Sequence, residues 1–129
     1  MPDSERLRAS SLPTLALVNG RICTRDARRP WVDAVLVRAG RVVAVGSSAE
    51  LRKRAGQCAT LVDVQGLLVI PLRPEGRLAA GEAADLAVVD VGHLSGEPPP
   101  TFEEQRIVLI IEQGRVLLDR HSLVRTDLT

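Results

Sequence analysis

Short apolar runs separated by glycine turns form the main pattern of the chain. Leu15–Val18 is followed by Asn19-Gly20 and by a second run, Arg21–Thr24. Asn-Gly between two apolar runs is the strongest short-range hairpin signal, because both residues accept the positive φ of a tight turn. The same order of run, x-Gly-Arg turn and run returns twice, so three hairpins are predicted. Their turns are Asn19-Gly20, Ala39-Gly40 and Gln113-Gly114, and Gln65-Gly66 is a fourth possible turn between 61–64 and 67–70.

Few helices interrupt these strands. A serine cap at Ser47 or Ser48 predicts a short helix that ends before Gly56. A further strand is predicted at Leu86–Val91, and Thr101–Gln105 is expected to form a second helical turn. About eight to ten short strands without alternating long helices are typical of a sandwich or barrel. The predicted fold is therefore mainly β: a β-sandwich or small open barrel of short antiparallel strands with one or two short helices.

Composition narrows the function classes. Of 129 residues, 45% are hydrophobic and 26% are charged, which fits one globular domain. A net charge of +1 gives no electrostatic basis for binding nucleic acid or an anionic membrane, and two aromatic residues cannot form a stacking platform for bases. No apolar run approaches the roughly 20 residues of a membrane span. The charged N-terminus and the two lone cysteines, Cys23 and Cys58, lead us to expect a cytoplasmic protein.

Several segments, read in order, resemble an amidohydrolase-superfamily enzyme. The resemblance covers about residues 14–120. Arg29-Pro30-Trp31 resembles the amidohydrolase-3 branch in particular. The segments that resemble the opening of these enzymes are Leu17–Ile22, Arg29–Ala34, Val37–Gly46 and Val62–Pro71, and those that resemble the closing part are Gly76–Asp90 and Gln105–Asp119.

The resemblance implies a composite β-sandwich whose two halves normally flank a metal-dependent TIM barrel. In that family Pro71 would precede a Gly-Phe-x-Asp-x-His-x-His segment that supplies two metal ligands, whereas here Leu72–Gly76 leads directly into the closing segment. A (β/α)₈ barrel needs about 250 residues, more than the whole chain has. We therefore expect a sandwich without its barrel, through a deletion that is either natural or engineered.

The expected domain organisation follows from this resemblance. Residues 1–13 form a mobile N-terminal tail, 14–120 the composite sandwich and 121–129 a C-terminal tail. Within the sandwich, 14–71 and 77–120 are the two halves. Residues 72–76, which we call the seam, replace the barrel.

Candidate metal ligands are few and scattered. His93 and His121 are the only histidines, and Cys23 and Cys58 lack the spacing of a zinc motif. The single lysine, Lys53, lies on the predicted helix. Solvated histidines and buried cysteines are therefore the expected roles.

The other polar candidates are expected to be structural or solvated. Acid–base chemistry needs two carboxylates that face one cleft, and the resemblance implies a structural role for Asp85, which hydrogen-bonds near a strand start. Trp31 is expected to anchor the core or its rim. No residue is assigned a catalytic, cofactor-binding or metal-binding role. The remaining candidates considered are Asp63 and Asp90 beside strands, the serines Ser10, Ser11, Ser47 and Ser48 without a partner histidine, and Arg21, Arg41 and Arg115 after turn glycines.

The predicted function is a non-catalytic β-sandwich domain that acts as a scaffold or association module. The resemblance implies a parent hydrolase acting on C–N bonds other than peptide bonds. A homo-oligomer is expected, through apolar surface that once faced the barrel or through edge strands. Two alternatives stay open: a small hydrolase with a metal site rebuilt from His93, His121 and nearby carboxylates, and an interaction module that pairs with a separately encoded barrel chain.

Overall fold

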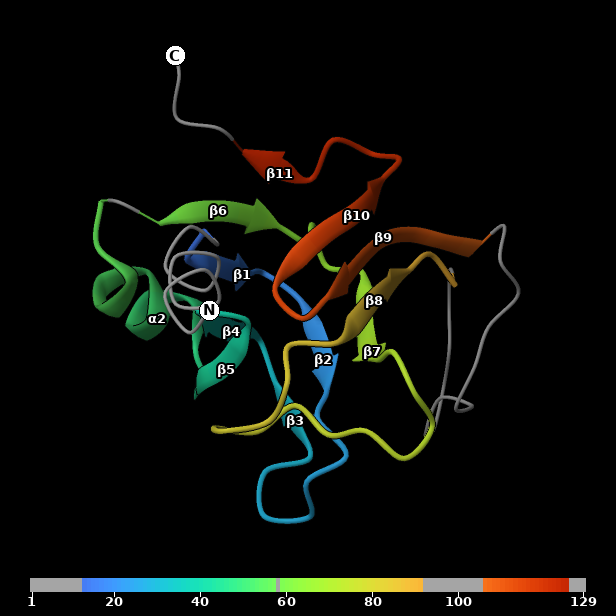
Figure 1. Cartoon of the computed structure of the whole chain (residues 1–129), viewed down its shortest axis with the longest axis horizontal. Coiled ribbons are helices and arrows are strands. Elements are labelled where there is room, and N and C mark those ends of the chain that lie inside the picture. The colour runs from blue at the N-terminus through green and yellow to red at the C-terminus, as the bar shows by residue number, and fades with distance from the viewer. Residues whose placement is uncertain (1–12, 58, 92–105, 126–129) are drawn as a thin grey trace, which may run out of the picture.

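Two mixed β-sheets carry the fold (Figure 1). The computed structural model describes residues 13–57, 59–91 and 106–125. The first sheet has the order β11-β6-β1-β4-β5 and the second β10-β9-β8-β7-β2-β3. The strands of the first sheet are β1 (Leu15–Val18), β4 (Ala34–Arg38), β5 (Arg41–Gly46), β6 (Thr60–Asp63) and β11 (Val124–Arg125). Those of the second are β2 (Arg21–Cys23), β3 (Trp31–Val32), β7 (Leu68–Pro71), β8 (Leu86–Val89), β9 (Ile107–Glu112) and β10 (Arg115–Asp119).

The predicted mainly β fold is confirmed, with one correction to strand direction. Most neighbours are antiparallel, but β1 pairs with β6 in parallel and β2 pairs with β7 in parallel. The segment that contains β6 and β7 therefore runs beside the segment that contains β1 and β2, in the same direction. The two segments are joined at the bend, where Val64 N donates to Val18 O at 2.9 Å and Gly66 N donates to Asn19 O at 2.6 Å.

Two of the three predicted hairpins are confirmed. β4 pairs with β5 around Ala39-Gly40, and β9 pairs with β10 around Gln113-Gly114. Both residues of each turn have positive φ, 53° and 82° in the first and 50° and 80° in the second. A two-residue turn with positive φ at both positions matches the twist of the flanking strands.

The hairpin predicted at Asn19-Gly20 is wrong. Asn19 does take a positive φ of 61°, but β1 and β2 lie in different sheets. All four residues of β1 are buried, and the strand lies between β4 and β6 at the centre of its sheet. β1 therefore takes its neighbours from elsewhere in the chain and does not pair with β2. Gln65-Gly66 also forms a turn, with φ of 59° and 80°, and likewise joins strands of different sheets.

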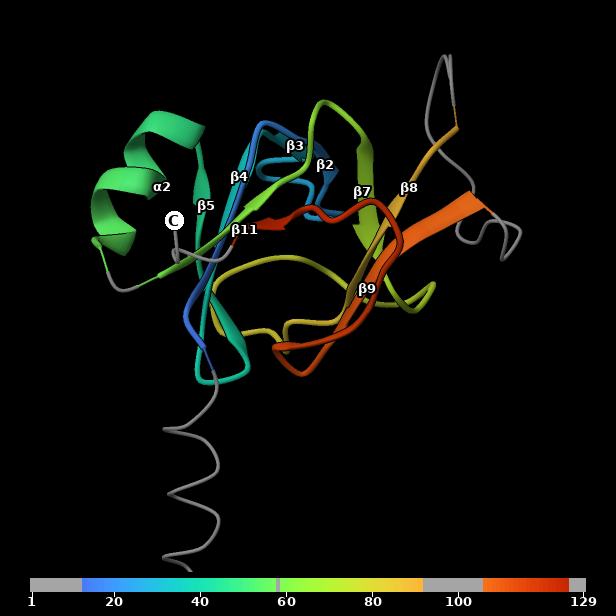
Figure 2. The ribbon, with the colours of Figure 1, turned by 90° about the horizontal axis from the view of Figure 1, so that it is seen from above.

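The core lies between the two sheets, and one helix covers the outside of the first (Figure 2). Helix α2 (Ser48–Ala55) contacts β1, β4 and β5 and buries Leu51. The predicted cap is confirmed, because the Ser47 side chain accepts a hydrogen bond from Glu50 N at 3.2 Å. Gly56 ends the helix with φ of 74°.

The domain continues beyond the predicted boundary at residue 120. Leu123 is fully buried in the core, and β11 pairs with β6. Asp119 stabilises the turn that leads from β10 to β11, since its carboxylate accepts hydrogen bonds from Leu123 N at 2.8 Å and Val124 N at 3.0 Å. The expected C-terminal tail is therefore wrong for 121–125. The predicted helical turn at Thr101–Gln105 and the tail over 1–12 lie outside the described residues.

Candidate functional site

The seam begins directly after β7 and folds into a turn whose first residue is hydrogen-bonded to the residue before β8. Leu72 N donates to Asp85 O at 3.0 Å, and Gly76 N donates to Arg73 O at 2.9 Å. Leu78, just after the seam, is fully buried. Position 72, where the resemblance expects a barrel to begin, is therefore hydrogen-bonded to the residue that precedes β8.

A three-residue ion-pair network links the seam to Asp85, which precedes β8, and to Glu112, which ends β9. Arg73 Nη1 lies 2.9 Å from Asp85 Oδ2, and Arg73 Nη2 lies 2.9 Å from Glu112 Oε2. The other oxygen of Asp85, Oδ1, accepts a hydrogen bond from Gln113 N at 2.7 Å. Asp85 thus has the contacts of a structural residue beside a strand start, as the resemblance implies.

The segment after the seam also links the two halves through their backbones. Val42 N donates to Glu82 O at 2.9 Å, and Gly81 N donates to Val42 O at 2.8 Å. Ala84 N donates to Gly40 O at 3.0 Å. This segment pairs with the outer edge of β5, so that edge of the first sheet is partly closed.

The candidate metal ligands do not gather into a site. Among the residues that the structure describes, no group of three or more His, Cys, Asp or Glu side chains is placed to hold a metal ion. Cys23 is a buried free thiol, and His121 and Lys53 are exposed. His93 and Cys58 lie outside the described residues.

The remaining polar candidates have structural or surface positions. Asp63 accepts hydrogen bonds from Asn19 Nδ2 at 3.2 Å and from Gln65 N at 3.1 Å, which supports the bend between the sheets. Arg41 Nη1 donates to Gly81 O at 3.0 Å. Asp90, Ser47 and Arg115 are exposed, Ser48 is half-buried, and Ser10 and Ser11 lie outside the described residues.

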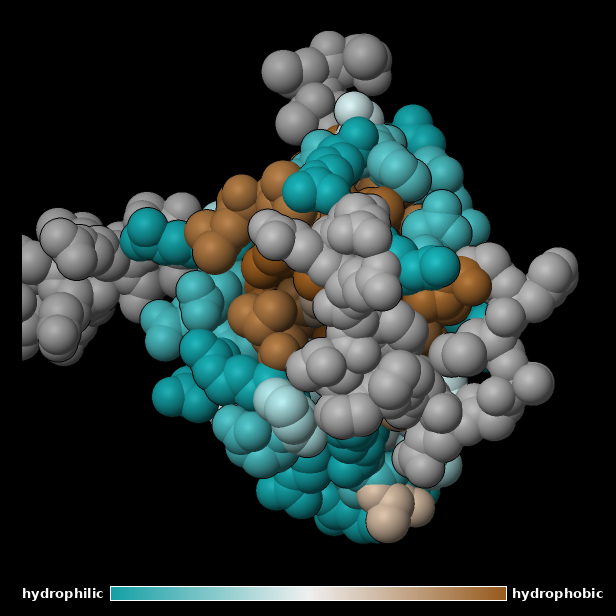
Figure 3. Space-filling view, turned by 90° about the vertical axis from the view of Figure 1, so that its right-hand side faces the viewer, coloured by the Kyte–Doolittle hydropathy of each residue, from teal (hydrophilic) through white to brown (hydrophobic). Residues whose placement is uncertain are grey.

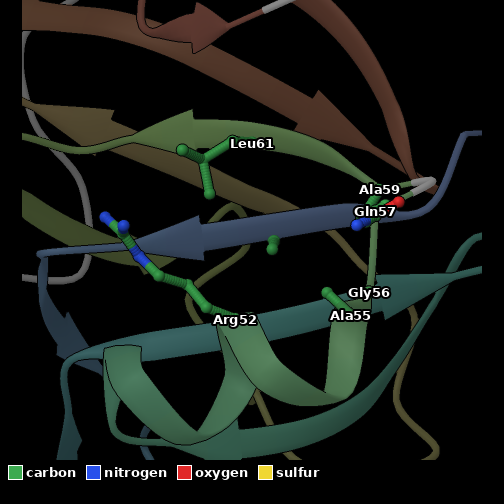
Figure 4. Close-up of a pocket in the computed structure, with 7 residues that line it drawn as sticks. Arg52, Ala55, Gly56, Gln57, Ala59 and Leu61 are labelled. Carbon is green, nitrogen blue, oxygen red and sulfur yellow. The ribbon is translucent and has the colours of Figure 1, made fainter. Parts of the chain in front are cut away.

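A shallow groove between α2 and β6 was not predicted from the sequence. It has a volume of about 520 Å³, and Figure 4 shows Arg52 extending from the helix toward β1 beside it. Three separate elements contribute its walls, so no local pattern indicates it. The described residues of the groove offer small apolar surface and one guanidinium, and no two of them form a titratable pair for acid–base chemistry. Its lining is Ala16, Arg52, Ala55, Gly56, Gln57, Ala59 and Leu61.

Apolar side chains also line the outer face of the second sheet. They alternate with the core residues along β7 and β8, and Figure 3 shows brown side chains on this side of the molecule. Of the large hydrophobic side chains described, Trp31 at 43% and Leu117 at 59% are the exposed ones. The buried members of the face are Cys23, Leu68, Ile70, Ala87 and Val89.

Helices of membrane-spanning length are missing from the described part of the chain. Within residues 13–57, 59–91 and 106–125, no helix is long and apolar enough to cross a bilayer.

The sequence is similar to known proteins over part of their length. Residues 34–57 match the family model of the imidazolonepropionase-like composite domain of bacteria. N-substituted formamide deformylase from Arthrobacter pascens is 30% identical over 99 residues, 77% of this chain and 18% of that protein. Protein LONG AFTER FAR-RED 3 from Arabidopsis thaliana is 35% identical over 63 residues, 49% of this chain and 11% of that protein. The chain therefore spans less than a fifth of either relative.

Solved structures with partial similarity include two hydrolase-type proteins. An uncharacterized metal-dependent hydrolase from Pyrococcus furiosus has a TM-score of 0.39 and 25% identity, over 46% of this chain and 13% of that one. Enamidase, described as a new member of the amidohydrolase superfamily, has a TM-score of 0.40 and 32% identity, over 46% of this chain and 16% of that one. By its family-model match over residues 34–57, the chain is similar to the composite domain of imidazolonepropionase-like enzymes, and it is also similar to part of the curated deformylase.

Proposed function

We propose that this chain acts as a non-catalytic composite domain, a scaffold that associates with itself. The observation that carries the proposal is the closed seam, in which Arg73 joins Asp85 and Glu112 at 2.9 Å each. With β7 joined to β8 by this network, the two halves share one core without an inserted barrel. A deformylase is among the relatives, so we assign hydrolysis of non-peptide C–N bonds to the parent enzyme rather than to this domain.

The proposed contact between copies is strand β10. It is the last strand of the second sheet, and among the described strands it pairs with β9 alone. Leu117 lies at a register shift between Val116 and Leu118, and its side chain is 59% exposed. An edge strand with an exposed large apolar side chain favours pairing with another chain. We place the assembly in the cytoplasm, where a free buried thiol such as Cys23 stays reduced.

Sedimentation velocity tests this proposal with two matched variants. Leu117→Glu places a charge on the β10 edge, and Ala49→Glu places the same charge on the exposed side of α2. We expect the original chain and the Ala49→Glu variant to sediment as dimers or larger species at tens of micromolar. Leu117→Glu should sediment as a monomer. A monomeric original chain at these concentrations would overturn self-association.

A further inference from the structure

A rigid loop joins β2 to β3 at one end of the molecule. We call residues 24–30 the arginine loop; it projects from the foot of the molecule in Figure 1. Thr24 is 1% exposed, and its hydroxyl donates to Arg29 O at 2.6 Å and accepts from Asp26 N at 3.0 Å. Thr24 N also donates to Pro30 O at 3.0 Å. These bonds fix the backbone of the loop from inside.

The loop and the strand before it are strongly basic. Residues 21–31 contain four arginines and one aspartate in a chain whose net charge is +1. Arg28 forms hydrogen bonds to Asp26 through its backbone N at 3.1 Å and through Nε at 3.3 Å, yet its side chain remains 85% exposed. Arg29 Nη1 donates to Val45 O at 3.3 Å, which ties the loop to β5.

Trp31 stands at the edge of this basic surface. Its side chain is 43% exposed, and the Arg21 guanidinium lies 5.8 Å from the ring centroid. Beside it is a hollow of about 330 Å³ that could hold one apolar side chain. Trp and Arg are the residue types most enriched at the energetic centres of protein interfaces. The hollow is lined by Cys23, Arg25, Asp26, Ala27, Pro30 and Trp31.

We propose that the arginine loop and Trp31 bind an acidic segment of a partner protein. An apolar side chain of that segment occupies the hollow beside Trp31, and its carboxylates face the surrounding arginines. Charge complementarity selects the partner, because the local excess of three positive charges attracts carboxylates and raises the association rate. The loop is already ordered by Thr24, so little conformational entropy is lost on binding. This surface lies at β3, at the opposite edge of the second sheet from β10.

The single tryptophan of the chain makes the proposal directly measurable. We would titrate the full chain, at 50 mM salt, with a synthetic peptide of alternating Glu-Glu-Leu repeats and follow the emission of Trp31. We expect a saturable blue shift that is lost at 500 mM salt, and no shift with the matching Lys-Lys-Leu peptide.

Variants distinguish peptide binding at the proposed surface from general charge attraction. Followed by the anisotropy of a labelled peptide, Trp31→Ala should weaken binding about 10-fold, and Arg28→Gln should weaken it several-fold. Arg54→Gln removes the same charge from the exposed side of α2 and should leave affinity unchanged. Equal losses in the Arg28→Gln and Arg54→Gln variants would overturn the proposal. So would the absence of any shift with the acidic peptide, or a shift only with vesicles of four parts phosphatidylcholine to one part phosphatidylglycerol.

Discussion

Gly40 and Gly114 bring the two confirmed hairpin turns into backbone contact. A Cβ atom placed on Gly114 would lie 2.6 Å from Gly40 Cα and 3.1 Å from Gly40 N. The turns belong to different halves of the domain and to different sheets. Gly114 N donates to Ala84 O, and Ala84 N donates to Gly40 O, so a single residue after the seam bridges both turns.

Replacing Gly114 by alanine should strongly destabilise the domain. The added methyl group meets backbone that cannot move aside, and φ of 80° is itself unfavourable for alanine. We expect the free energy of unfolding to fall by about 2–4 kcal/mol, measured by urea denaturation. Gly66→Ala is the control, since Gly66 has the same φ of 80° but open space around a Cβ. It should cost about 1 kcal/mol, and equal losses in both variants would exclude a role for the contact.

Removing the Asp85 carboxylate should loosen the seam. Asp85→Ala leaves Gln113 N without its acceptor and separates Arg73 from β8. A loss of about 1–3 kcal/mol in the free energy of unfolding is expected. Arg77→Ala, which removes an exposed ion pair to Glu82 at 3.4 Å, should cost less than about 0.5 kcal/mol. If thermal denaturation gave the two variants the same midpoint, the network would not be what holds the seam.

Local chemistry explains why some of these features could be predicted and others could not. Ala39-Gly40 and Gln113-Gly114 form hairpins as predicted, because each turn joins strands that are neighbours in one sheet. Asn19-Gly20 has the same local signal, but β1 pairs with β4 and β6. The Asn19-Gly20 turn therefore leads the chain from the first sheet into the second. Turn residues specify a bend; which strands then pair depends on burial across the whole domain.

The seam depends on contacts between residues that are distant in the sequence. Arg73 and Glu112 are 39 positions apart, and neither lies in a motif that indicates the other. The arginine loop could not be predicted either, because the bonds of the Thr24 hydroxyl that order it leave no sequence pattern. Trp31 is expected to anchor the core or its rim, and its 43% exposure fits the rim position.

Zinc binding should be substoichiometric. After incubation with zinc and desalting, elemental analysis should find well below one equivalent per chain, because no described group of three ligands converges. The same chain treated with chelator before incubation is the control for metal carried through purification. Retention of one equivalent or more would instead support the alternative of a rebuilt metal site, and His93 and His121 would be the first residues to replace.

The arginine loop should respond to acid through Asp26. Hydrogen bonds from Arg28, first from its backbone N and then from its side chain, lower the pKa of the Asp26 carboxyl below its ordinary value of 3.8. A carboxyl whose pKa is lower in the folded state stabilises that state above pH 3.8 and loses this contribution as pH falls through the folded-state pKa.

Because Asp26 and Trp31 line the same hollow, the emission of Trp31 should report this titration. We expect constant emission from pH 7 to about pH 4 and a change only below the ordinary carboxyl range. Asp26→Asn has no group to titrate, so its emission should stay constant over the same acidic interval while circular dichroism shows the domain still folded. A transition that persists in Asp26→Asn would assign the response to another carboxyl, and one centred above pH 4 would contradict the lowered pKa.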